Sequence, residues 1–481
     1  MDQIKPLVIP FSPDNVAIIK NKDLCSECGH CYSVCQEEIG VGSRYHFLPG
    51  EEYKCIGCGQ CAAVCPTGAL TIKSYTEQVW EELMNPEKKV VVQFAPAVRV
   101  AIGEINEDSE VQIVGTASRT SNGLKDGVIV NIEAAMNSIR ETIEAAEQNA
   151  GMEVVSCITS IGGTQIEGIN SKGIVAVSSA GKNAKEIRMD DVNRVIEAAR
   201  AVQIPMDKDT LHVIPQNFIV DGVSGIKDPI DRLGVRLEAE VHIITSSKTI
   251  IQNVNTCIQR ANYMLGGVML KTLASTKAVV HEDELDLGSI IIDLGAGTTD
   301  ILVVINGAPV CTASIPVGGN LVTNDIHLVK GITFEDAERI KINDGCCWLP
   351  NADTSRSVII QGVGGRAPEE SSQEELCQII MPRMEEIFTM VRDTIINKTN
   401  ISQLSGNIIL VGGGANMNGV VELVQEVFGT SSVRIGIPEY MGGVVENYRN
   451  PEWSTAVGLI VANRNGTTVR TTSKRKSKNF D

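Results

Sequence analysis

Aromatic side chains are scarce in this chain of 481 residues, where Phe, Trp and Tyr together make up 4%. The core must therefore rest on Val, Ile, Leu and Ala, and the apolar content of 43% is ordinary for a globular protein. The sequence also lacks an apolar run of about 18 or more residues, so we expect no membrane-spanning helix. Its first residues carry no basic stretch followed by an apolar one, which argues against a secretory signal and favours the cytoplasm.

Positive charge is in short supply as well. The 42 Lys and Arg residues are outnumbered by 59 Asp and Glu residues, which gives a formal net charge of −17. A phosphate backbone selects basic surfaces, so we expect no nucleic acid among the partners. The length predicts two to four domains, at about 100–200 residues per domain.

Cysteine, in contrast, is plentiful, and eight of the fourteen cysteines fall between residues 25 and 65. In a reducing cytosol we interpret the other six as buried small hydrophobic residues. Cys346 and Cys347 are adjacent and could form a redox pair, but neighbouring cysteines rarely bond to each other. The six are Cys157, Cys257, Cys311, Cys346, Cys347 and Cys377.

The eight clustered cysteines form two runs with the spacing C-x2-C-x2-C-x3-C, and Pro66 follows the second run. This spacing is typical of proteins with two [4Fe–4S] clusters, in which the fourth cysteine of each run ligates the other cluster. Structural zinc would use paired Cys-x2-Cys motifs with four ligands per site, and disulfides do not suit the cytosol. We therefore predict one cluster on Cys25, Cys28, Cys31 and Cys65, and a second on Cys55, Cys58, Cys61 and Cys35.

Residues 55–70 resemble the two-cluster ferredoxin-type domain of iron-only hydrogenases, and residues 90–104 resemble the opening of their catalytic domain. The catalytic cysteines of that family do not follow, since the next cysteine is Cys157 in a different context. The resemblance therefore implies electron transfer and does not imply hydrogen chemistry.

The rest of the chain alternates short apolar runs with amphipathic helices, which indicates an α/β architecture. One helix is expected from an N-cap at Asn131 to about Gln148, and a strand is expected over 154–160. A strand at 290–292 enters the sequence Asp-Leu-Gly-Ala-Gly-Thr-Thr-Asp at 293–300, and a second strand leaves it. The backbone amides of such a turn can face phosphate oxygens, and the turn contains Gly295, Gly297, Thr298 and Thr299. Asp293 could hold the water shell of a Mg²⁺ ion.

A second glycine-rich turn follows an apolar strand at 408–411 and contains Gly412, Gly413, Gly414 and Met417. Bare backbone here would let an adenosine lie flat on the turn. Either turn alone could be a plain β-hairpin. Both together, at this separation, favour the fold shared by actin, Hsp70 and sugar kinases.

Within that group, residues 104–465 resemble the FtsA family of bacterial cell-division proteins. The resemblance implies an actin-like ATPase fold with duplicated ribonuclease H-like halves and an inserted subdomain at 174–245, preceded by an α+β ferredoxin-like domain. It also implies ATP binding with Mg²⁺, self-association into filaments, and binding of the C-terminal peptide of FtsZ by residues 321–405, at the septal membrane. Family segments that carry the match include 131–134, 159–171, 211–221, 234–244, 316–325 with Gly318 and Gly319, 337–342 and 433–438.

Glu338 and Lys341 lie at i, i+3 on one expected helix. In actin-like proteins such a pair contacts the adenosine. The alternative is a solvated ion pair within the helix.

Three features depart from the family. Its first phosphate loop carries an Asp, but residues 94–97 here are Phe-Ala-Pro-Ala, without acid, hydroxyl or glycine. Lys271 stands where such ATPases place an acid or Gln that orients water, so we expect weak or absent hydrolysis. The tail at 464–481 is basic with almost no apolar residues, which predicts a disordered segment that could contact anionic lipid only through charge.

The sequence thus predicts seven segments: 1–86 ferredoxin-like, 87–173 first core part, 174–245 insertion, 246–320 core with the phosphate turn, 321–405 upper subdomain, 406–463 adenosine site, and 464–481 tail. The favoured hypothesis is a cytoplasmic cell-division scaffold with an appended electron-transfer module. Two others stay open: an iron–sulfur oxidoreductase subunit with an ATP-binding regulatory domain, and a recombined gene that switches families within one strand.

Overall fold

A computed structural model describes residues 18–34, 60–67, 69–72, 88–94, 97–105, 110–125, 127–177, 184–362, 364–365, 367–399, 406–443 and 447–463. The chain separates into two compact units, Met1–Asn85 and Pro86–Asp481, each described here by itself. No helix in these ranges combines the length and the apolar character needed to cross a bilayer.

In the described residues of the first unit, there are one small sheet and two single-turn helices. Strand β1 (Ile18–Lys20) pairs antiparallel with β2 (Leu70–Ile72), which joins the two sides of the cysteine-containing segment. Helices α1 (His30–Ser33) and α3 (Gln60–Ala63) each carry one of the cysteine runs. The small core of this unit consists of Cys31, Val34, Cys61 and Leu70.

The second unit contains two five-stranded sheets with the same topology. In the first, the strand order is β15-β8-β3-β4-β5, with β3, β8 and β15 parallel and β4 and β5 antiparallel to their neighbours. Its strands are β3 (Lys88–Phe94), β4 (Ala97–Ile105), β5 (Val111–Thr120), β8 (Ser156–Ile161) and β15 (Met264–Leu270).

The second sheet has the order β18-β17-β16-β21-β22, which is the same arrangement when its strands are numbered from one to five. This repeat confirms the predicted duplication into two α/β halves. Its strands are β16 (Ser289–Leu294), β17 (Thr299–Ile305), β18 (Ala308–Ile315), β21 (Asn407–Val411) and β22 (Val433–Ile435).

Helices cover both sheets. In the first half, α5 (Ile132–Ala150) packs on β4 and β5, and α14 (Ser454–Ala462) packs on β3 and β4. The predicted N-cap of α5 is correct, because the Asn131 side chain accepts a hydrogen bond from the Ala134 amide. Helix α7 (Lys248–Arg260) packs on β15, and α8 (Lys271–Val279) packs on α14, whereas α9 (Glu282–Leu287) packs on β17 of the second sheet.

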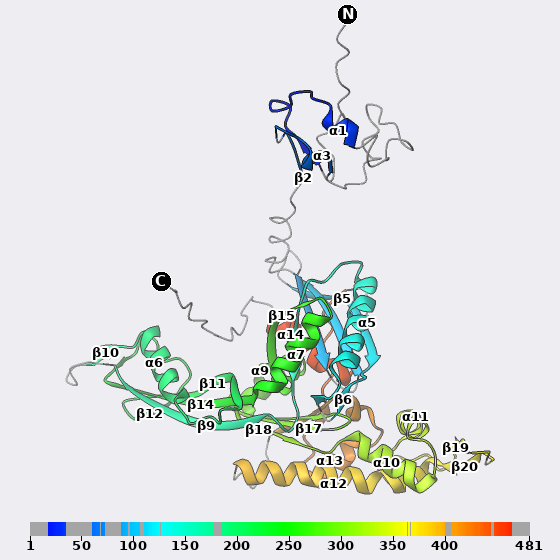
Figure 1. Cartoon of the computed structure of the whole chain (residues 1–481). Helices are drawn as coiled ribbons and strands as arrows, with labels where there is room; N and C mark the ends of the chain where they lie inside the picture. Colours follow the sequence, from blue (N-terminus) through cyan, green and yellow to red (C-terminus); the bar gives the residue numbers. More distant parts are fainter. Residues whose placement is uncertain are drawn as a thin grey trace, which may run out of the picture. The chain divides into compact units, whose positions relative to one another are not determined.

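In the second half, the long helix α12 (Gln373–Thr399) packs with α10 (Gly319–Lys330), α13 (Val420–Phe428) and β18 (Figure 1). Outside the inserted lobe, the described residues of the two halves also form α11 (Phe334–Asp344), the 3₁₀ turns η3 (Leu349–Asn351), η4 (Gly413–Asn416) and η5 (Pro451–Trp453), and the short strands β6 (Leu124–Lys125), β7 (Val128–Ile129), β19 (Ser357–Ile360) and β20 (Glu369–Ser372).

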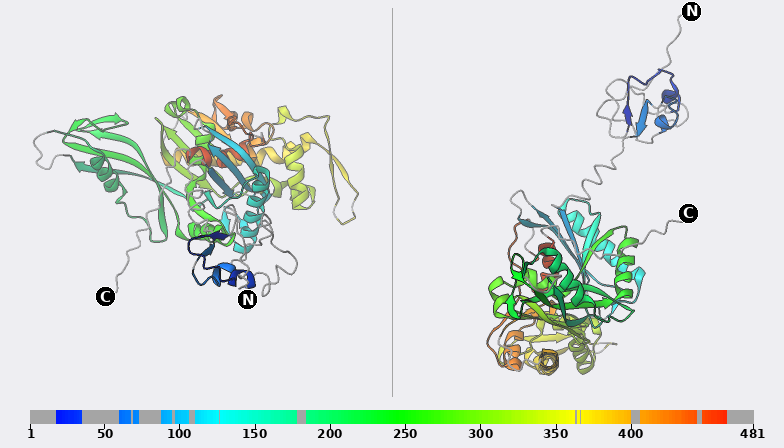
Figure 2. Two further views of the ribbon diagram at one scale, coloured as in Figure 1. Left: turned by 90° about the horizontal axis from the view of Figure 1, so that it is seen from above. Right: turned by 90° about the vertical axis from the view of Figure 1, so that its left-hand side faces the viewer.

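An inserted lobe extends from the two halves within the second unit (Figure 2). It has its own four-stranded sheet in the order β12-β11-β14-β9, its own helix α6 (Met189–Arg200), and a separate core that includes Val195, Leu237 and Ile243. The predicted boundary at residue 174 falls inside β9. The strands are β9 (Glu167–Ala176), β11 (Lys208–Val220), β12 (Val223–Ile226) and β14 (Arg236–Ser247), with a small pair β10 (Lys185–Glu186) and β13 (Leu233–Gly234).

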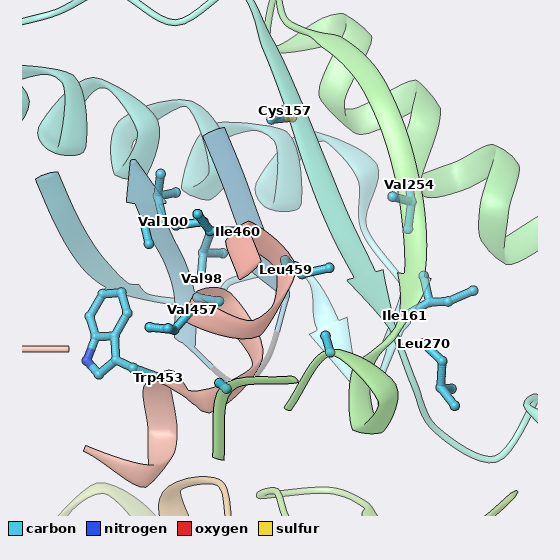
Figure 3. Packing of buried hydrophobic residues seen from close by; sticks show 14 of the residues in the cluster. Val98, Val100, Cys157, Ile161, Val254, Leu270, Trp453, Val457, Leu459 and Ile460 are labelled. Atoms are coloured by element: carbon cyan, nitrogen blue, oxygen red, sulfur yellow. The ribbon is translucent and has the colours of Figure 1, made fainter. Parts of the chain in front are cut away.

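The hydrogenase-like segment 90–104 is built into the first sheet as β3 and most of β4. Val98 and Val100 of β4 are buried in the same core as Val457 and Ile460 of α14 (Figure 3). Arg99 of β4 also forms an ion pair with Glu452, close to the start of α14. The segment therefore packs as part of the second unit, and a change of family resemblance within one strand has not interrupted the core.

Candidate functional site

Two carboxylic side chains are buried at the hairpin that joins β16 to β17. Asp293 is the last residue but one of β16, and Asp300 lies directly opposite it on β17. Like charges at directly opposite positions of a β-ladder repel each other. The hairpin therefore requires a nearby cation or proton.

Lys271, the first residue of α8, provides that cation. Its buried ammonium lies 3.0 Å from Asp293 Oδ1 and 3.2 Å from Asp300 Oδ2. Burial alone would lower the pKa of Lys271, but the two carboxylates outweigh it and raise this pKa above its usual value. The lysine is therefore charged at neutral pH.

Both oxygens of Asp300 have partners. Its Oδ1 accepts a hydrogen bond from the Gly163 amide at 2.9 Å, and its Oδ2 meets Lys271 and, at 3.4 Å, the Thr298 hydroxyl. Of the two acids, the sequence predicted a role for Asp293 and missed one for Asp300. The signal that could have found Asp300 is its place at the far end of the same eight-residue motif.

The glycines of the turn allow α10 to dock against it. The Gly319 amide donates to the Gly295 carbonyl at 3.0 Å, and the Asn320 amide donates to the Ala296 carbonyl at 2.8 Å. A Cβ on Gly318 would lie 2.6 Å from the Gly295 carbonyl oxygen, so a side chain does not fit there. The predicted residues Gly295, Gly318 and Gly319 thus form one tight junction.

The second glycine turn packs on the end of β16. Gly412 has a φ of 85°, and a Cβ there would lie 2.4 Å from Asp293 Oδ1 and 2.7 Å from the Leu294 carbonyl oxygen. Gly414 similarly faces Leu294. Gly413 is the first residue of η4, and Met417 directly follows it. Because Gly412 and Gly414 contact Asp293 and Leu294, the two predicted glycine turns meet at these two residues.

Lys341 and Glu338 of α11 form an ion pair of 2.6 Å. Lys341 also donates to the Gly319 carbonyl at 3.2 Å and to the Thr323 hydroxyl at 2.9 Å, which connects α11 to the first turn of α10. Desolvation lowers the pKa of Lys341, against the opposing effect of Glu338. The Glu338–Lys341 pair is half-buried, and hydrogen bonds to α10 hold the lysine in place. The contact of this pair with adenosine stays a prediction.

A cavity of about 190 Å³ opens beside the hairpin. Gly295, Gly297 and Thr298 line it, whereas Asp293, Thr299, Gly318, Gly319, the second glycine turn and the Glu338–Lys341 pair do not. Lys271, which the sequence marked only as a departure, also lines the cavity. Its other lining residues include Lys125, Ser160, Gly162, Ile250, Asp300 and Asn320.

In the first unit, the four cysteines predicted for one cluster, Cys25, Cys28, Cys31 and Cys65, line a common cavity of about 20 Å³ together with Gly29 and Thr67. No three His, Cys, Asp or Glu residues in the described ranges come close enough to hold a single metal ion.

Hydrogen bonds from the backbone and side chain of His30 lower the pKa of Cys28 to about 7, which favours the thiolate that iron requires. Burial at Cys65 acts in the opposite direction, but hydrogen bonds from Leu70 and Thr67 lower the pKa of this thiol overall. The second predicted ligand set includes Cys61, which is buried, whereas Cys35, Cys55 and Cys58 lie outside the described residues.

The six scattered cysteines are all buried, as predicted, and among the described residues no disulfide joins any of them. Burial raises the pKa of the Cys157 thiol to about 12 and also raises that of Cys347. These thiols are therefore protonated and unreactive at neutral pH.

Two halves with the same strand order, and two glycine turns that meet at a buried aspartate of the second half, define an actin-like fold. Among solved structures, the PilM–PilN type IV pilus biogenesis complex is similar in fold, with a TM-score of 0.55 at 17% identity over 78% of this chain and 98% of that chain.

Sequence comparisons identify the family. The model described as "Cell division protein FtsA" matches residues 290–458, and that of the "SHS2 domain inserted in FTSA" matches residues 163–245. The chain is 43% identical to "Cell division protein FtsA" of Borreliella burgdorferi over 75% of this chain and 86% of that protein, and 38% identical to that of Pseudomonas aeruginosa over 75% and 85%. The chain belongs to the FtsA family, as the sequence predicted.

The N-terminal prediction has support as well, because the model of a "4Fe-4S binding domain" matches residues 51–71. This range contains the second cysteine run.

Proposed function

We propose that this protein is a cell-division scaffold that binds ATP between its two actin-like halves, self-associates, and recruits FtsZ to the septal ring. The observation that supports this proposal most strongly is family membership over three quarters of the chain, together with an intact glycine turn at 293–300. The predicted basic tail at 464–481 lies outside the described residues, and contact of this tail with anionic lipid at the inner face of the membrane is part of the proposal.

Recruitment of FtsZ is proposed for residues 321–405. Four large apolar side chains on α10 and α11 are exposed there, which suits a partner peptide. They are Leu328, Val329, Phe334 and Ile342.

A pull-down with an immobilised FtsZ C-terminal peptide tests this surface on the full-length protein. Ile342→Glu should weaken capture, whereas the matched change Leu287→Glu, on exposed α9 outside the segment, should not. Equal capture by both variants, or no capture by the wild type, would contradict the assignment.

ATP binding is proposed at the cavity beside the β16–β17 hairpin, where backbone amides and the Thr298 hydroxyl can meet phosphate oxygens. We propose weak or absent hydrolysis because Lys271, being charged, cannot accept a proton from an attacking water. Calorimetric titration of anaerobically purified full-length protein with ATP tests binding, and pelleting with and without ATP tests self-association. Turnover comparable to that of other actin-like ATPases would contradict the hydrolysis proposal.

The first unit is proposed to hold two [4Fe–4S] clusters and to transfer electrons, and the shared cavity of four cysteines supports this second activity. When bound, such clusters supply one-electron chemistry. Iron and sulfide analysis, with electron paramagnetic resonance of the reduced protein, should give about eight irons per chain. Zinc in place of iron would contradict the proposal.

The magnesium ion predicted from Asp293 does not fit the donor set as it stands, because the carboxylates of Asp293 and Asp300 are both paired with Lys271. Mg²⁺ is usually held in proteins through one or two carboxylates and its own waters. We therefore assign no step to this ion.

A further inference from the structure

The sequence predicted Mg²⁺ beside Asp293, but the structure places the Lys271 ammonium there. The following inference rests on the proposed nucleotide binding. We infer that the ammonium of Lys271 replaces the divalent cation at the phosphate turn, so that this protein binds the nucleotide triphosphate without Mg²⁺. The inference concerns binding only and requires no chemical step.

The first support is where the charge lies. Asp293 and Asp300 face each other across the β16–β17 ladder, and the ammonium sits within 3.2 Å of an oxygen of each. A divalent cation bound by this pair would have to occupy the same position. Ammonium and metal therefore exclude each other as long as α8 begins where it does.

The second support is the direction in which Lys271 faces. It lines the cavity together with Gly295, Gly297 and Thr298, and a Cβ on Gly295 would lie 3.6 Å from Lys271 Nζ. An ammonium has three N–H donors, and the two carboxylates account for two of them. The third can meet a phosphate oxygen, for which lysine is a common partner as a point charge.

The third support is the supply of carboxylates. Among the described residues that line the cavity, Asp300 is the only acid, and both of its oxygens already have partners. The corresponding turn of the first half, residues 94–97, contains no acid in its sequence. A hydrated Mg²⁺ would thus have to displace Lys271 from a buried position before it could bind.

The test is calorimetric titration of the full-length protein with ATP, once with Mg²⁺ and once with EDTA. We expect the two dissociation constants of the wild type to agree within about threefold, since the same ammonium meets the phosphates in both cases. Binding that needs Mg²⁺ would overturn the inference while leaving the proposed nucleotide binding intact. Absence of binding under both conditions would overturn the nucleotide proposal, and the role of Lys271 with it.

Substitution of the lysine sharpens the test. Lys271→Gln should weaken binding in EDTA by about tenfold or more, and added Mg²⁺ should restore it because the aspartates become available. The matched control is Lys277→Gln, which removes the same charge from an exposed position of the same helix and should behave like the wild type.

Since Lys271→Gln leaves two acids buried together, it can unfold the protein. The double variant Lys271→Gln/Asp300→Asn keeps the charge of the hairpin unchanged, and near-ultraviolet circular dichroism checks its fold. Binding of this folded variant in EDTA with wild-type affinity would also overturn the inference.

Discussion

The two halves of the core share one topology but differ in the chemistry of the turn between their first two strands. In the second half, β16 and β17 are joined by a glycine-rich turn between two buried aspartates. In the first half, β3 and β4 pair antiparallel in the same position of the sheet, but the residues at 94–97 are Phe-Ala-Pro-Ala. The strand order is therefore independent of the phosphate chemistry of the turn.

The difference between these two turns indicates what each half contributes to the fold and to the proposed phosphate site. Pairing of β3 with β4 and burial of Val98 and Val100 depend only on apolar alternation, which the hydrogenase-like sequence provides as well as any other. The proposed phosphate contact depends on specific glycines, hydroxyls and charges, which the sequence of the second half contains. The first half contributes Lys271 from α8, directly after its last strand β15.

The largest loss of stability is expected where the glycine turn at 412–414 packs on the end of β16. Gly412→Val should destabilise the protein by about 4 kcal/mol or more and abolish ATP binding, since φ is 85° and the Cβ would lie 2.4 Å from Asp293 Oδ1. Gly413→Val is the matched control, because a Cβ there has no neighbour within 4 Å. Urea denaturation followed by circular dichroism measures both. Equal stability of the two variants would show that the turn is looser than described.

A smaller effect is expected in the first half, where β4 packs against α14. Gly103→Val places its Cβ about where the Ile460 side chain lies, at 2.6 Å from Cγ2, and overpacking of this kind costs about 2 to 3 kcal/mol. The double variant with Ile460→Ala should recover part of that loss in the same denaturation experiment. If Gly103→Val has no effect, the hydrogenase-like strand is not packed in the core, and the equivalence of the two halves fails.

Acid should weaken the link between the inserted lobe and the first half. Burial lowers the pKa of His212 to about 4, and its Nε2 accepts the Leu270 amide at 2.9 Å, next to Lys271. The unfolded chain binds this proton below about pH 6.5, whereas the folded chain does not until about pH 4, so stability falls as pH falls through that window.

For His212 this amounts to a loss of about 2 kcal/mol between pH 7 and pH 5. His212→Gln should remove about this much of the pH dependence of the free energy of unfolding, measured by urea denaturation at pH 7 and pH 5. An unchanged slope in the variant would show that His212 is protonated in the folded protein or does not accept the Leu270 amide.

The smallest effect is expected for the ion pair between β4 and the region before α14. Arg99→Ala should cost about 1 kcal/mol, since pairs that keep some solvent contact are worth little. Thermal melts should give a smaller difference in high salt than in low salt, because salt screens an ion pair that keeps contact with solvent. A loss several times larger would mean that Arg99, rather than apolar packing, joins the hydrogenase-like strand to the rest.

Much of this architecture was predictable, for reasons that particular residues make clear. The apolar run before Asp293 and the glycines after it determine a buried hairpin, and Asn131 determines the start of α5. The spacing of the cysteines anticipated that Cys25, Cys28, Cys31 and Cys65 share a cavity, although 40 residues separate the first from the last.

The pairing of Lys271 with Asp293 and Asp300 was not predictable. These residues come from α8, β16 and β17, and only the packing of the first half on the second brings the lysine to the hairpin. The sequence therefore marked Lys271 as the loss of a catalytic group, whereas the structure gives it carboxylate partners. The predicted start of the inserted lobe at residue 174 lies within β9, which runs from Glu167 to Ala176.

The most direct test of this comparison is hydrogen exchange of the full-length protein, measured by mass spectrometry with and without ATP in EDTA. The account predicts slower exchange of amides within 294–299 and 412–417, together with the start of α8, and no change at 97–100. Protection at 97–100 equal to that of the second half would contradict it, because both halves would then hold the phosphates despite their different turns.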